Sequence, residues 1–399
     1  MGYRTYTCPI ARTCGGCEWL AVPYPIQLRR KQEQVEELLA PQLDEDGCKL
    51  SPIVGMDEPL AFRHKAATPF APGRKGSIRS GFYQSGSHRI VACEDCLTEA
   101  PGMRATLNDV ARLAGRLHIP AYVEDQGTGV LRHAVLRAGW ATDERLLVLV
   151  TNGERLPRAQ RLVAGLLEAH PELTSIVQNV NERRTNAILG HRSITLHGPG
   201  TMRDRLLGCT FSIGATSFYQ TNPAQTEVLY RLAVEGAGLE DGMRVLDAYC
   251  GTGTIGICAA HQARAKGKNV QVTGVEVVRQ AVAAARANAQ ANGVADACSF
   301  VCGDATAHMA ELTGASGRGR YDVILMDPPR AGSTPEFLSG VARLAPERVV
   351  YVSCNPVTLA RDLVQLRKGG YRIARATPVD MFPHTKHAEM VVVLARSGA

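Results

Sequence analysis

A cysteine stands between a β-branched run and the start of a helix in the stretch YVSCNPVTLARDL, residues 351–363. Asn355 is a favourable helix N-cap, Pro356 suits the first helical position, and the two glycines at 369–370 can end the helix. The positive end of the helix dipole favours a thiolate over a thiol, whose ordinary pKa is about 8.5. We therefore predict that Cys354 is a nucleophile, although most strand-end cysteines are inert.

A thiolate that adds to an electron-poor ring needs a nearby base to take up the proton that the ring later loses. The stretch DMFPHTKHAEMVVVL places Glu389 at the start of a final strand. Asp380, His384 and His387 lie in the same stretch and are alternatives. We predict Glu389 as the base.

Apolar, β-rich runs alternate with helical stretches from about Gln220 to the C-terminus. MRVLDAYC precedes TIGICAAHQARAK, VQVTGVEVV precedes RQAVAAARANAQANG, YDVILMD precedes PEFLSGVARL, and ERVVYVSC precedes the helix after Cys354. This alternation predicts an α/β fold with a mostly parallel, doubly wound sheet. Ligands bind at the carboxyl ends of the strands in such sheets, which is where Cys354 falls.

Glycine and acidic residues follow these predicted strands. Gly251 belongs to a G-T-G turn that lets a ligand approach the backbone and a helix N-terminus. Glu276 ends the second strand at the spacing for binding ribose hydroxyls, Asp304 ends the third, and Asp327 ends the fourth in the motif MDPPRAG. An NAD-binding domain shares the glycine pattern, but this succession of acids resembles the class I S-adenosylmethionine methyltransferases.

Uracil provides a use for a thiolate beside a methyl donor, because its C5 attacks a methyl sulfonium only after a thiolate has added at C6. The motifs SFYQTNP, DAYCGTGTIGI, MDPPRAG, VSCNPVTLARDL and DMFPHTKHAE together resemble the RNA uracil-C5-methyltransferases. The N-terminal motifs CPIARTCGGCEWL, AFRHKA and CEDCLTEAP extend the resemblance over nearly the whole chain. An amino-methyltransferase is the weaker alternative, because Arg330 replaces the aromatic residue of its motif.

The resemblance implies roles for individual residues. Cys354 is then the nucleophile and Glu389 the proton-abstracting base. Phe218 is placed to stack on a target base flipped out of the RNA, and the alternative for both Phe218 and Tyr219 is that they are ordinary core aromatics. The residues expected to bind S-adenosylmethionine are Gln220, Tyr249, Gly251, Glu276, Asp304 and Asp327.

Within the family, the chain is most similar to the branch that methylates a uridine of 23S ribosomal RNA. It begins directly with the cysteine segment, without the N-terminal TRAM barrel of a related branch, and the tRNA branch lacks the cysteine cluster. We therefore expect 23S rRNA as the partner, with the tRNA T-loop as the alternative. A non-catalytic iron–sulfur RNA-binding protein is a second alternative, which the intact Cys354 and Glu389 oppose.

The twelve cysteines are unevenly distributed. Cys8, Cys14 and Cys17 form C-x5-C-x2-C, and Cys93 and Cys96 form C-x2-C. Clustered cysteines in a reducing compartment more often bind metal than form disulfides, and their spacing fits zinc or an iron–sulfur cluster equally. The resemblance implies a [4Fe-4S] cluster held by the first three and Cys96, which precedes a short stretch ending in Pro. Cys93 is the alternative fourth ligand.

The bulk composition fits a globular enzyme of two or three domains, with 399 residues, 45% hydrophobic content and a net charge of +7. No apolar run reaches the ~18 residues of a membrane span, and the N-terminus has no signal core. We therefore expect a cytoplasmic protein that needs no membrane and no obligate protein partner. We expect an iron–sulfur segment at 1–48, a central α+β RNA-binding domain at 49–217 and the methyltransferase domain at 218–399.

The central domain should contain the β-like runs HAVLRAGW, RLLVLVTNG, SIVQNVNE and NAILG and the helices ATLNDVARLAGRLHI and RAQRLVAGLLEAH. Before it, YPIQLRRKQEQVEELLAPQL reads as an amphipathic helix with a basic face. Its Arg29, Arg30 and Lys31, and the segment FRHK at 62–65, either contact RNA phosphates or are solvated surface.

Overall fold

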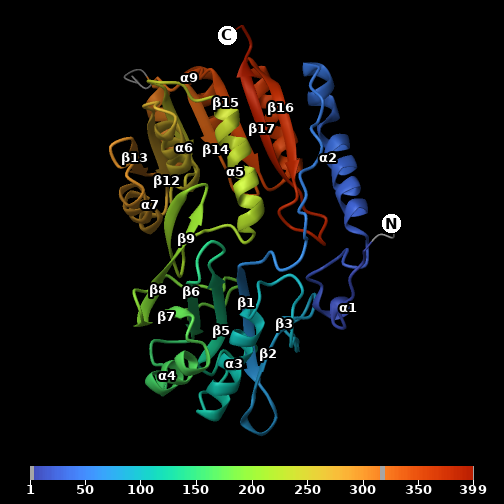
Figure 1. Cartoon of the computed structure of the whole chain (residues 1–399), viewed down its shortest axis with the longest axis vertical. Coiled ribbons are helices and arrows are strands. Elements are labelled where there is room, and N and C mark those ends of the chain that lie inside the picture. Colours follow the sequence, from blue (N-terminus) through green and yellow to red (C-terminus); the bar gives the residue numbers. More distant parts are fainter. Residues whose placement is uncertain (1–3, 315–319, 399) are drawn as a thin grey trace.

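Two β-sheets organise the chain, which a computed structural model describes over residues 4–314 and 320–398. Figure 1 shows the sheet of the C-terminal half above the sheet of the central region, with the long helix α2 (Tyr24–Asp46) alongside the upper sheet. The N-terminal cysteine segment, with the short helix α1 (Ala11–Cys14), lies beside the junction of the two halves.

The C-terminal sheet has seven strands in the order β13-β12-β11-β14-β15-β17-β16. Its first five strands are parallel, and β17 pairs antiparallel with both neighbours. The predicted doubly wound sheet is therefore confirmed. The strand bounds are β11 (Arg244–Ala248), β12 (Gln271–Glu276), β13 (Cys298–Cys302), β14 (Val323–Met326), β15 (Arg348–Ser353), β16 (Tyr371–Val379) and β17 (Glu389–Arg396).

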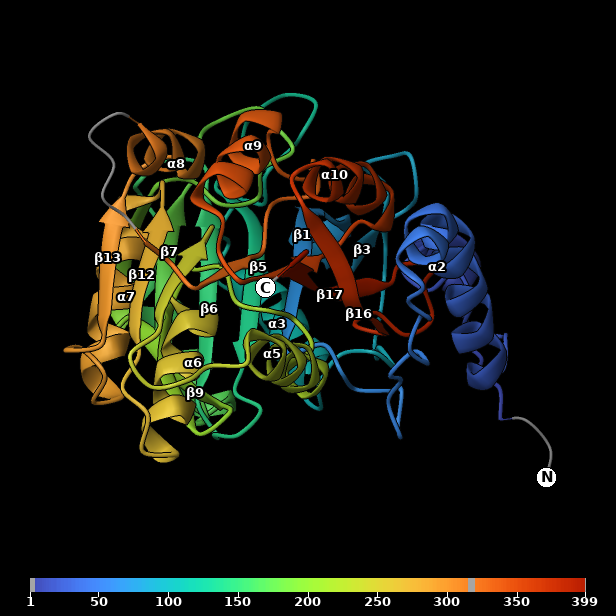
Figure 2. The same ribbon diagram turned by 90° about the horizontal axis from the view of Figure 1, so that it is seen from above.

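Helices cover both faces of this sheet, as the view in Figure 2 shows. On one face lie α5 (Pro223–Ala237), α6 (Thr254–Ala265) and α7 (Arg279–Ala291); on the other lie α8 (Ala305–Thr313), α9 (Pro335–Leu344) and α10 (Pro356–Lys368). Two apolar cores result, one on each side of the strands.

The predicted N-cap of α10 is confirmed, since Asn355 Oδ1 accepts a hydrogen bond from Val357 N at 3.2 Å, and the helix ends before Gly369.

The central sheet has six strands in the order β2-β1-β5-β6-β7-β8. Helices α3 (Met103–Arg116) and α4 (Ala159–Ala169), both predicted, pack their apolar stripes against one face of it. The strand bounds are β1 (Lys65–Pro72), β2 (Ile78–Ser80), β5 (Leu131–Ala138), β6 (Arg145–Thr151), β7 (Leu173–Val180) and β8 (Arg192–His197). A short pair, β3 (Phe82–Tyr83) and β4 (Ile90–Val91), and the one-turn helix η1 (Arg74–Gly76) complete this region.

The predicted strand NAILG, residues 186–190, is wrong, because this segment is a loop. The side-chain amide of Asn181 donates to the carbonyl oxygens of Ala187 and Ile188 at 2.7 and 3.0 Å, so a side chain takes the place of a neighbouring strand. Gly190 then passes so close to the backbone of Val180 that a Cβ there would lie 1.8 Å from its oxygen. Local hydrogen bonding therefore overrides the apolar pattern.

The two halves share a core. The hairpin of β9 (Thr201–Leu206) and β10 (Cys209–Gly214) places Phe211 in the same apolar cluster as Val135 of the central sheet and Ile257 of the C-terminal half. Helix α2 adds Val35, Leu39 and Leu43 to the core on the other side of the C-terminal sheet. Within the described ranges, no helix is both long and apolar enough to cross a bilayer.

Candidate active site

Four parallel strands end side by side at one edge of the C-terminal sheet. Ala248 of β11 pairs with Val275 of β12 and with Met326 of β14, and Met326 pairs in turn with Tyr351 of β15. The residues that follow these positions therefore emerge at the same edge. They are Tyr249, Glu276, Asp327 and Cys354, of which the first and the last lie more than a hundred residues apart in the sequence.

The turn after β11 and the end of β12 are joined by the carboxylate of Glu276. Glu276 Oε2 accepts a hydrogen bond from Gly251 N at 3.1 Å, and Oε1 accepts one from Val278 N at 2.8 Å. Gly251 has a φ of 56°, and no atom lies within 4 Å of the position that a Cβ would take. Glycine is therefore needed for its backbone conformation, and the space in front of it is open to a ligand.

Of three other predicted donor-binding residues, Tyr249 and Asp304 follow strands of this sheet, and Gln220 lies outside it. Tyr249, half-buried with a φ of 63°, has its hydroxyl 2.9 Å from that of Ser333. Asp304 is the N-cap of α8, where it accepts a hydrogen bond from Ala307 N at 2.9 Å. Gln220 is half-buried in the segment between β10 and α5.

Two aromatic residues of this segment differ in exposure. Phe218 has 66% of its surface exposed, which leaves its ring free to stack on a base. Tyr219 packs against the shared core, in agreement with the alternative that it is a core aromatic.

Cys354 and Glu389 both adjoin the last residue pair of β15 and β17. Ser353 of β15 pairs antiparallel with Met390 of β17; Cys354 follows Ser353, and Glu389 precedes Met390. The two groups are near enough for the charge of Glu389 to raise the pKa of the Cys354 thiol. The predicted nucleophile and the predicted base therefore meet at the end of one strand pair.

The pKa values of the Glu389 and Asp327 carboxyl groups are both raised, which favours their protonated forms. Burial, followed by the charge of Asp327, raises the pKa of Glu389 to about 8, while the Arg330 guanidinium opposes the shift. Burial raises the pKa of Asp327 to about 7. A carboxyl group with a pKa near neutrality suits proton transfer at physiological pH.

The expected stabilisation of a Cys354 thiolate by the helix dipole is wrong for the protein without ligands. Burial raises the pKa of this thiol, and the charges of Glu389 and Asp327 raise it further. Arg330 and a backbone hydrogen bond at Cys354 lower the pKa but do not offset these effects. At the start of α10, the Val357 amide is bonded to the Asn355 side chain and Pro356 has no N–H. Positive charge near the sulfur comes instead from Arg330.

The thiol opens onto a cavity of about 210 Å³ between α2, the DPPR turn and the loop before β17. Its lining includes Cys354, Arg330, Lys386 and His387. Asn355 Nδ2 donates to the Arg330 carbonyl at 3.0 Å, which ties the DPPR turn to the nucleophile loop. Cys354 therefore lines the same cavity as the cationic side chains of Arg330 and Lys386.

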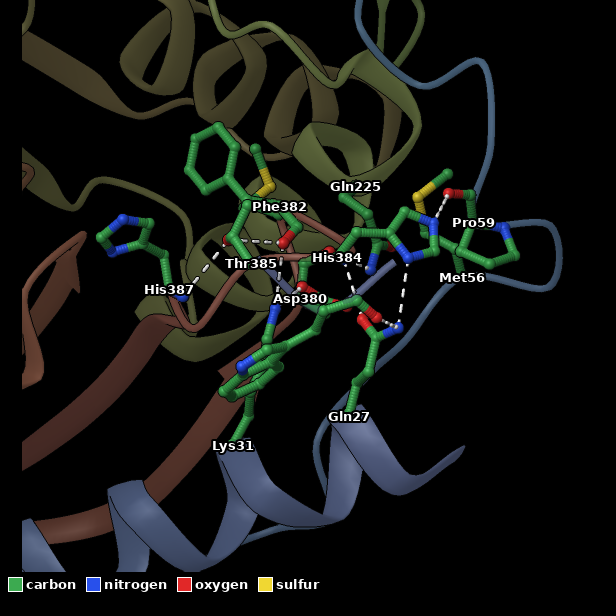
Figure 3. A network of polar contacts seen from close by, with 12 residues as sticks. Gln27, Lys31, Met56, Pro59, Gln225, Asp380, Phe382, His384, Thr385 and His387 are labelled. Carbon is green, nitrogen blue, oxygen red and sulfur yellow. Dashed lines mark hydrogen bonds and ion pairs between the residues drawn. The ribbon is translucent and has the colours of Figure 1, made fainter. Parts of the chain in front are cut away.

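Two of the alternative bases are excluded by their surroundings. Asp380 is fully buried and accepts hydrogen bonds from Lys31 Nζ at 2.6 Å and Tyr24 Oη at 2.8 Å. His384 is also fully buried, with Nε2 donating to Pro59 O and Nδ1 accepting from Gln27 (Figure 3). His387 is exposed and lines the cavity with Cys354, so it remains a neighbour of the reacting groups.

The expectation that Lys31 contacts phosphates or solvent is wrong. Its ammonium group lies in a buried ion pair with Asp380 and also donates to Phe382 O at 3.0 Å (Figure 3). The side chains of Arg29 and Arg30 are exposed. Tyr24, Gln27 and Lys31 continue the buried stripe of α2, and this helical spacing is the signal that could have identified Lys31 as buried.

Five thiols gather around one small cavity in the N-terminal region. Cys8, Cys14, Cys17, Cys93 and Cys96 all line a cavity of about 30 Å³. Burial raises the pKa of Cys17 to about 11, and the other thiols that contribute are Cys96, Cys14 and Cys8. Cys93 is buried, and its Sγ lies 3.0 Å from Asp95 O. Of the residues that the structure describes, no three Cys, His, Asp or Glu side chains converge in the arrangement required by a single metal ion.

Comparison with known proteins agrees with the arrangement of the C-terminal half. Residues 203–397 match the family described as tRNA (Uracil-5-)-methyltransferase. A protein of Halalkalibacterium halodurans described as an uncharacterized RNA methyltransferase is 43% identical over 387 residues, covering 97% of this chain and 82% of that protein. A Bacillus cereus protein with the same description is 38% identical over 98% of this chain and 82% of its own length.

A solved structure extends the similarity to three dimensions. The tRNA (uracil-54, C5)-methyltransferase of Pyrococcus abyssi, in complex with S-adenosyl-L-homocysteine, is 28% identical and superposes with a TM-score of 0.76. The similarity covers 98% of this chain and 87% of that one.

Proposed function

The chain belongs to the S-adenosylmethionine-dependent RNA (uracil-C5)-methyltransferases, and on that premise we propose that it methylates a uridine of 23S rRNA through a covalent bond between Cys354 and C6. The observation that carries the covalent route is that Cys354 and Glu389 adjoin the last pair of β15 and β17, Ser353 and Met390, with the Glu389 charge acting on the thiol. A nucleophile and a base on one strand pair can act on adjacent atoms of the same ring.

The proposed reaction begins when the Cys354 thiolate attacks C6 of a flipped uracil. The C5–C6 π electrons shift to give an enolate, and C5 then takes the methyl group as S-adenosylhomocysteine leaves. Glu389 removes the remaining C5 proton, and the returning electron pair expels the Cys354 thiolate. Glu389 must be ionised for this last step, which a pKa of about 8 allows for a fraction of molecules at neutral pH.

Separate residues are assigned to the binding of the methyl donor and of the target uracil. The proposed donor site consists of Gln220, Tyr249, Gly251, Glu276, Asp304 and Asp327. Phe218, with its exposed ring, is proposed to stack on the flipped uracil. Arg330 lies close enough to influence the pKa values of both reacting groups and supplies positive charge where the enolate develops.

A second candidate substrate is the T-loop of tRNA. The similarity to the Pyrococcus abyssi tRNA enzyme over 98% of this chain favours it. The assignment to 23S rRNA depends instead on the N-terminal cysteine motif. Both RNAs present the uridine in a loop, where an unpaired base can be splayed out.

Mapping of 5-methyluridine in ribosomal and transfer RNA, with and without the gene, tests the substrate. Loss of methylation at one 23S uridine supports the proposal, whereas loss confined to the T-loop establishes the tRNA alternative. Incubation with S-adenosylmethionine and RNA containing 5-fluorouridine tests the chemistry, because fluorine at C5 cannot leave as a proton and the adduct should persist. A donor-binding protein that forms no adduct would instead be a non-catalytic RNA-binding module.

The cysteine segment is proposed to hold a [4Fe-4S] cluster through Cys8, Cys14, Cys17 and Cys96. The four thiols line one cavity, and a polynuclear cluster binds each thiolate at a separate iron rather than at one point. When bound, the cluster would fasten the loop-rich N-terminal segment to the central region. We also propose the division into units 1–48, 49–217 and 218–399 and a cytoplasmic location, where the RNA substrate is found.

Anaerobic purification followed by iron and sulfide analysis tests this assignment. Cys96→Ser should lower the iron content, while Cys93→Ser should retain four irons per chain if Cys93 is not a ligand. If Cys96→Ser retains its iron and Cys93→Ser loses iron, Cys93 is the fourth ligand and Cys96 is not. Zinc alone in the anaerobic protein would refute the cluster.

A further inference from the structure

One face of the central sheet runs from the candidate active site to a separate cavity. In the antiparallel pair of β1 and β5, Lys65 lies opposite Arg137, Ala67 opposite Val135, and Pro69 opposite His133. These positions alternate with Ala66, Ala134 and Leu136, which pack with α3 and α4. The three pairs therefore share the face that is turned away from those helices, and the middle pair, Ala67 and Val135, packs into the core shared by the two halves, so only the two ends are available to a ligand.

The end of this face near the active site carries two cations. The Arg137 guanidinium donates through Nη2 to the carbonyl of Ser217, the residue before Phe218. Within residues 4–314 and 320–398, neither Lys65 nor Arg137 has a carboxylate within 4.0 Å. Burial and the neighbouring Arg137 lower the pKa of Lys65 to about 8. Arg137 is only 3% exposed and holds the backbone before Phe218, whereas Lys65 is partly exposed and is the cation available to an RNA phosphate.

The other end of the face opens into a cavity of about 330 Å³. Its lining includes Pro69, Tyr83, His88 and His133. The Tyr83 ring centroid lies 5.5 Å from that of His88 and 6.2 Å from that of His133. The volume falls in the range of small-ligand sites, and the rings offer π-faces on which a base can stack.

A buried polar atom at this cavity lacks a partner. His133 is 8% exposed, and its Nδ1 has no hydrogen-bond partner among the described residues. A buried imidazole nitrogen without a partner is unfavourable, and the edge of a nucleobase carries both donors and acceptors. The cavity therefore combines stacking surfaces with an unsatisfied polar group.

The spacing of the two ends matches a short RNA segment. Four residues of β1 separate Lys65 from Pro69, which is about 13 Å along a strand. An unstacked RNA chain crosses this distance in a few nucleotides. A phosphate at Lys65 would therefore lie between the target uridine at Phe218 and a base in the cavity.

We propose that the cavity lined by Tyr83, His88 and His133 binds a second unpaired base of the substrate RNA, and that Lys65 binds an intervening phosphate. The inference rests on the proposed function, because it assumes that the target uracil lies at Phe218 and Cys354. In this proposal, the central region binds the RNA loop that contains the target uridine. A uridine without a flexible neighbour a few nucleotides away would be a poor substrate.

A cycle of RNA and protein changes tests the base site. The substrate is a synthetic stem–loop carrying the uridine identified by mapping, with an abasic nucleotide at each loop position in turn. One abasic position should lower kcat/KM of the wild type about tenfold, as expected for a lost stacking interaction. In Tyr83→Ala and His88→Ala, the same abasic change should have little further effect. His88 is exposed in the turn between β3 and β4, so His88→Ala should fold normally even if Tyr83→Ala does not.

His197→Ala, which changes an exposed histidine on β8 outside the cavity lining, is the matched control and should retain the tenfold effect. Abasic effects that add to those of His88→Ala and Tyr83→Ala at every position would overturn the base site while leaving the methyltransferase assignment intact. Absence of uracil methylation by the wild type on every RNA would remove the proposed function and this inference together.

Salt dependence tests the phosphate site independently. Lys65→Gln should reduce the slope of log affinity against log salt concentration by about one, because one fewer counterion is released, whereas Lys65→Arg should preserve the slope. A merely structural role for Lys65 would weaken binding without changing the slope. An unchanged slope in Lys65→Gln would overturn the phosphate site.

Discussion

Replacement of Glu389 by Gln should make the folded protein less sensitive to rising pH. The carboxyl has an ordinary pKa of 4.5, and burial raises it to about 8 in the fold. Between these two pH values, the unfolded chain has released the proton that the folded chain still holds. The unfolded state then binds fewer protons, so the free energy of unfolding falls as pH rises, by up to about 1.4 kcal/mol per pH unit.

From pH 5.5 to 7.5, this one carboxyl should therefore lower the stability of the wild type by about 3 kcal/mol. Glu389→Gln has no proton to lose and should not show this part of the decline. The charge of Asp327 contributes to the raised pKa of Glu389, so the two carboxyls titrate as a coupled pair, and the comparison reports the removal of Glu389 from that pair. The stability of the wild type relative to Glu389→Gln should thus fall by about 3 kcal/mol from pH 5.5 to pH 7.5.

Urea unfolding followed by fluorescence provides the assay. The chain has two tryptophans, and Trp140→Phe leaves Trp19 as the only reporter. Trp19 N donates to His384 O at 2.9 Å, in the loop that precedes Glu389, so its emission follows the relevant part of the fold. Glu168→Gln, which changes an exposed carboxylate on α4, is the control and should keep the pH dependence of the wild type. Parallel curves for the wild type and Glu389→Gln would mean that Glu389 is already ionised in the fold, and the burial argument would fail.

Three further outcomes are expected. Cys354→Ala should abolish both methyl transfer and the 5-fluorouridine adduct. Binding of S-adenosylmethionine, measured by calorimetry, should remain intact. Residual turnover by this variant would exclude the covalent route. Lys31→Met should lower the free energy of unfolding in urea by about 3–5 kcal/mol, because it leaves the Asp380 carboxylate buried without its cation. The double variant Lys31→Met/Asp380→Leu should recover much of this loss. Equal stability of Lys31→Met and the wild type would contradict the buried ion pair. Asp304→Ala should cost about 1 kcal/mol through the lost N-cap of α8, with Asp304→Asn retaining most of the stability by the same measurement.

Much of the C-terminal half could be predicted from the sequence because its signals are local. Alternating β-rich and helical runs indicate a doubly wound sheet, and Asn355 and Pro356 mark the start of α10. The same approach failed at residues 186–190, where the Asn181 side chain bonds the carbonyls that a strand would have used. It also failed for Lys31, because residue type suggested a solvated cation whereas helical spacing placed the side chain on the buried stripe of α2.

The sequence by itself determined which side chains were available for chemistry: a thiol at a strand end, acids after successive strands, and cysteines in two groups. Only the tertiary structure decided which of these meet, because the pairing of β15 with β17 brings Cys354 and Glu389 together from segments separated by α10 and β16. It also raised the pKa of Glu389, since this carboxyl is buried near the carboxylate of Asp327. Residue type sets the ordinary acidity of a group, but the burial and charge that shift this acidity arise from segments brought together by folding.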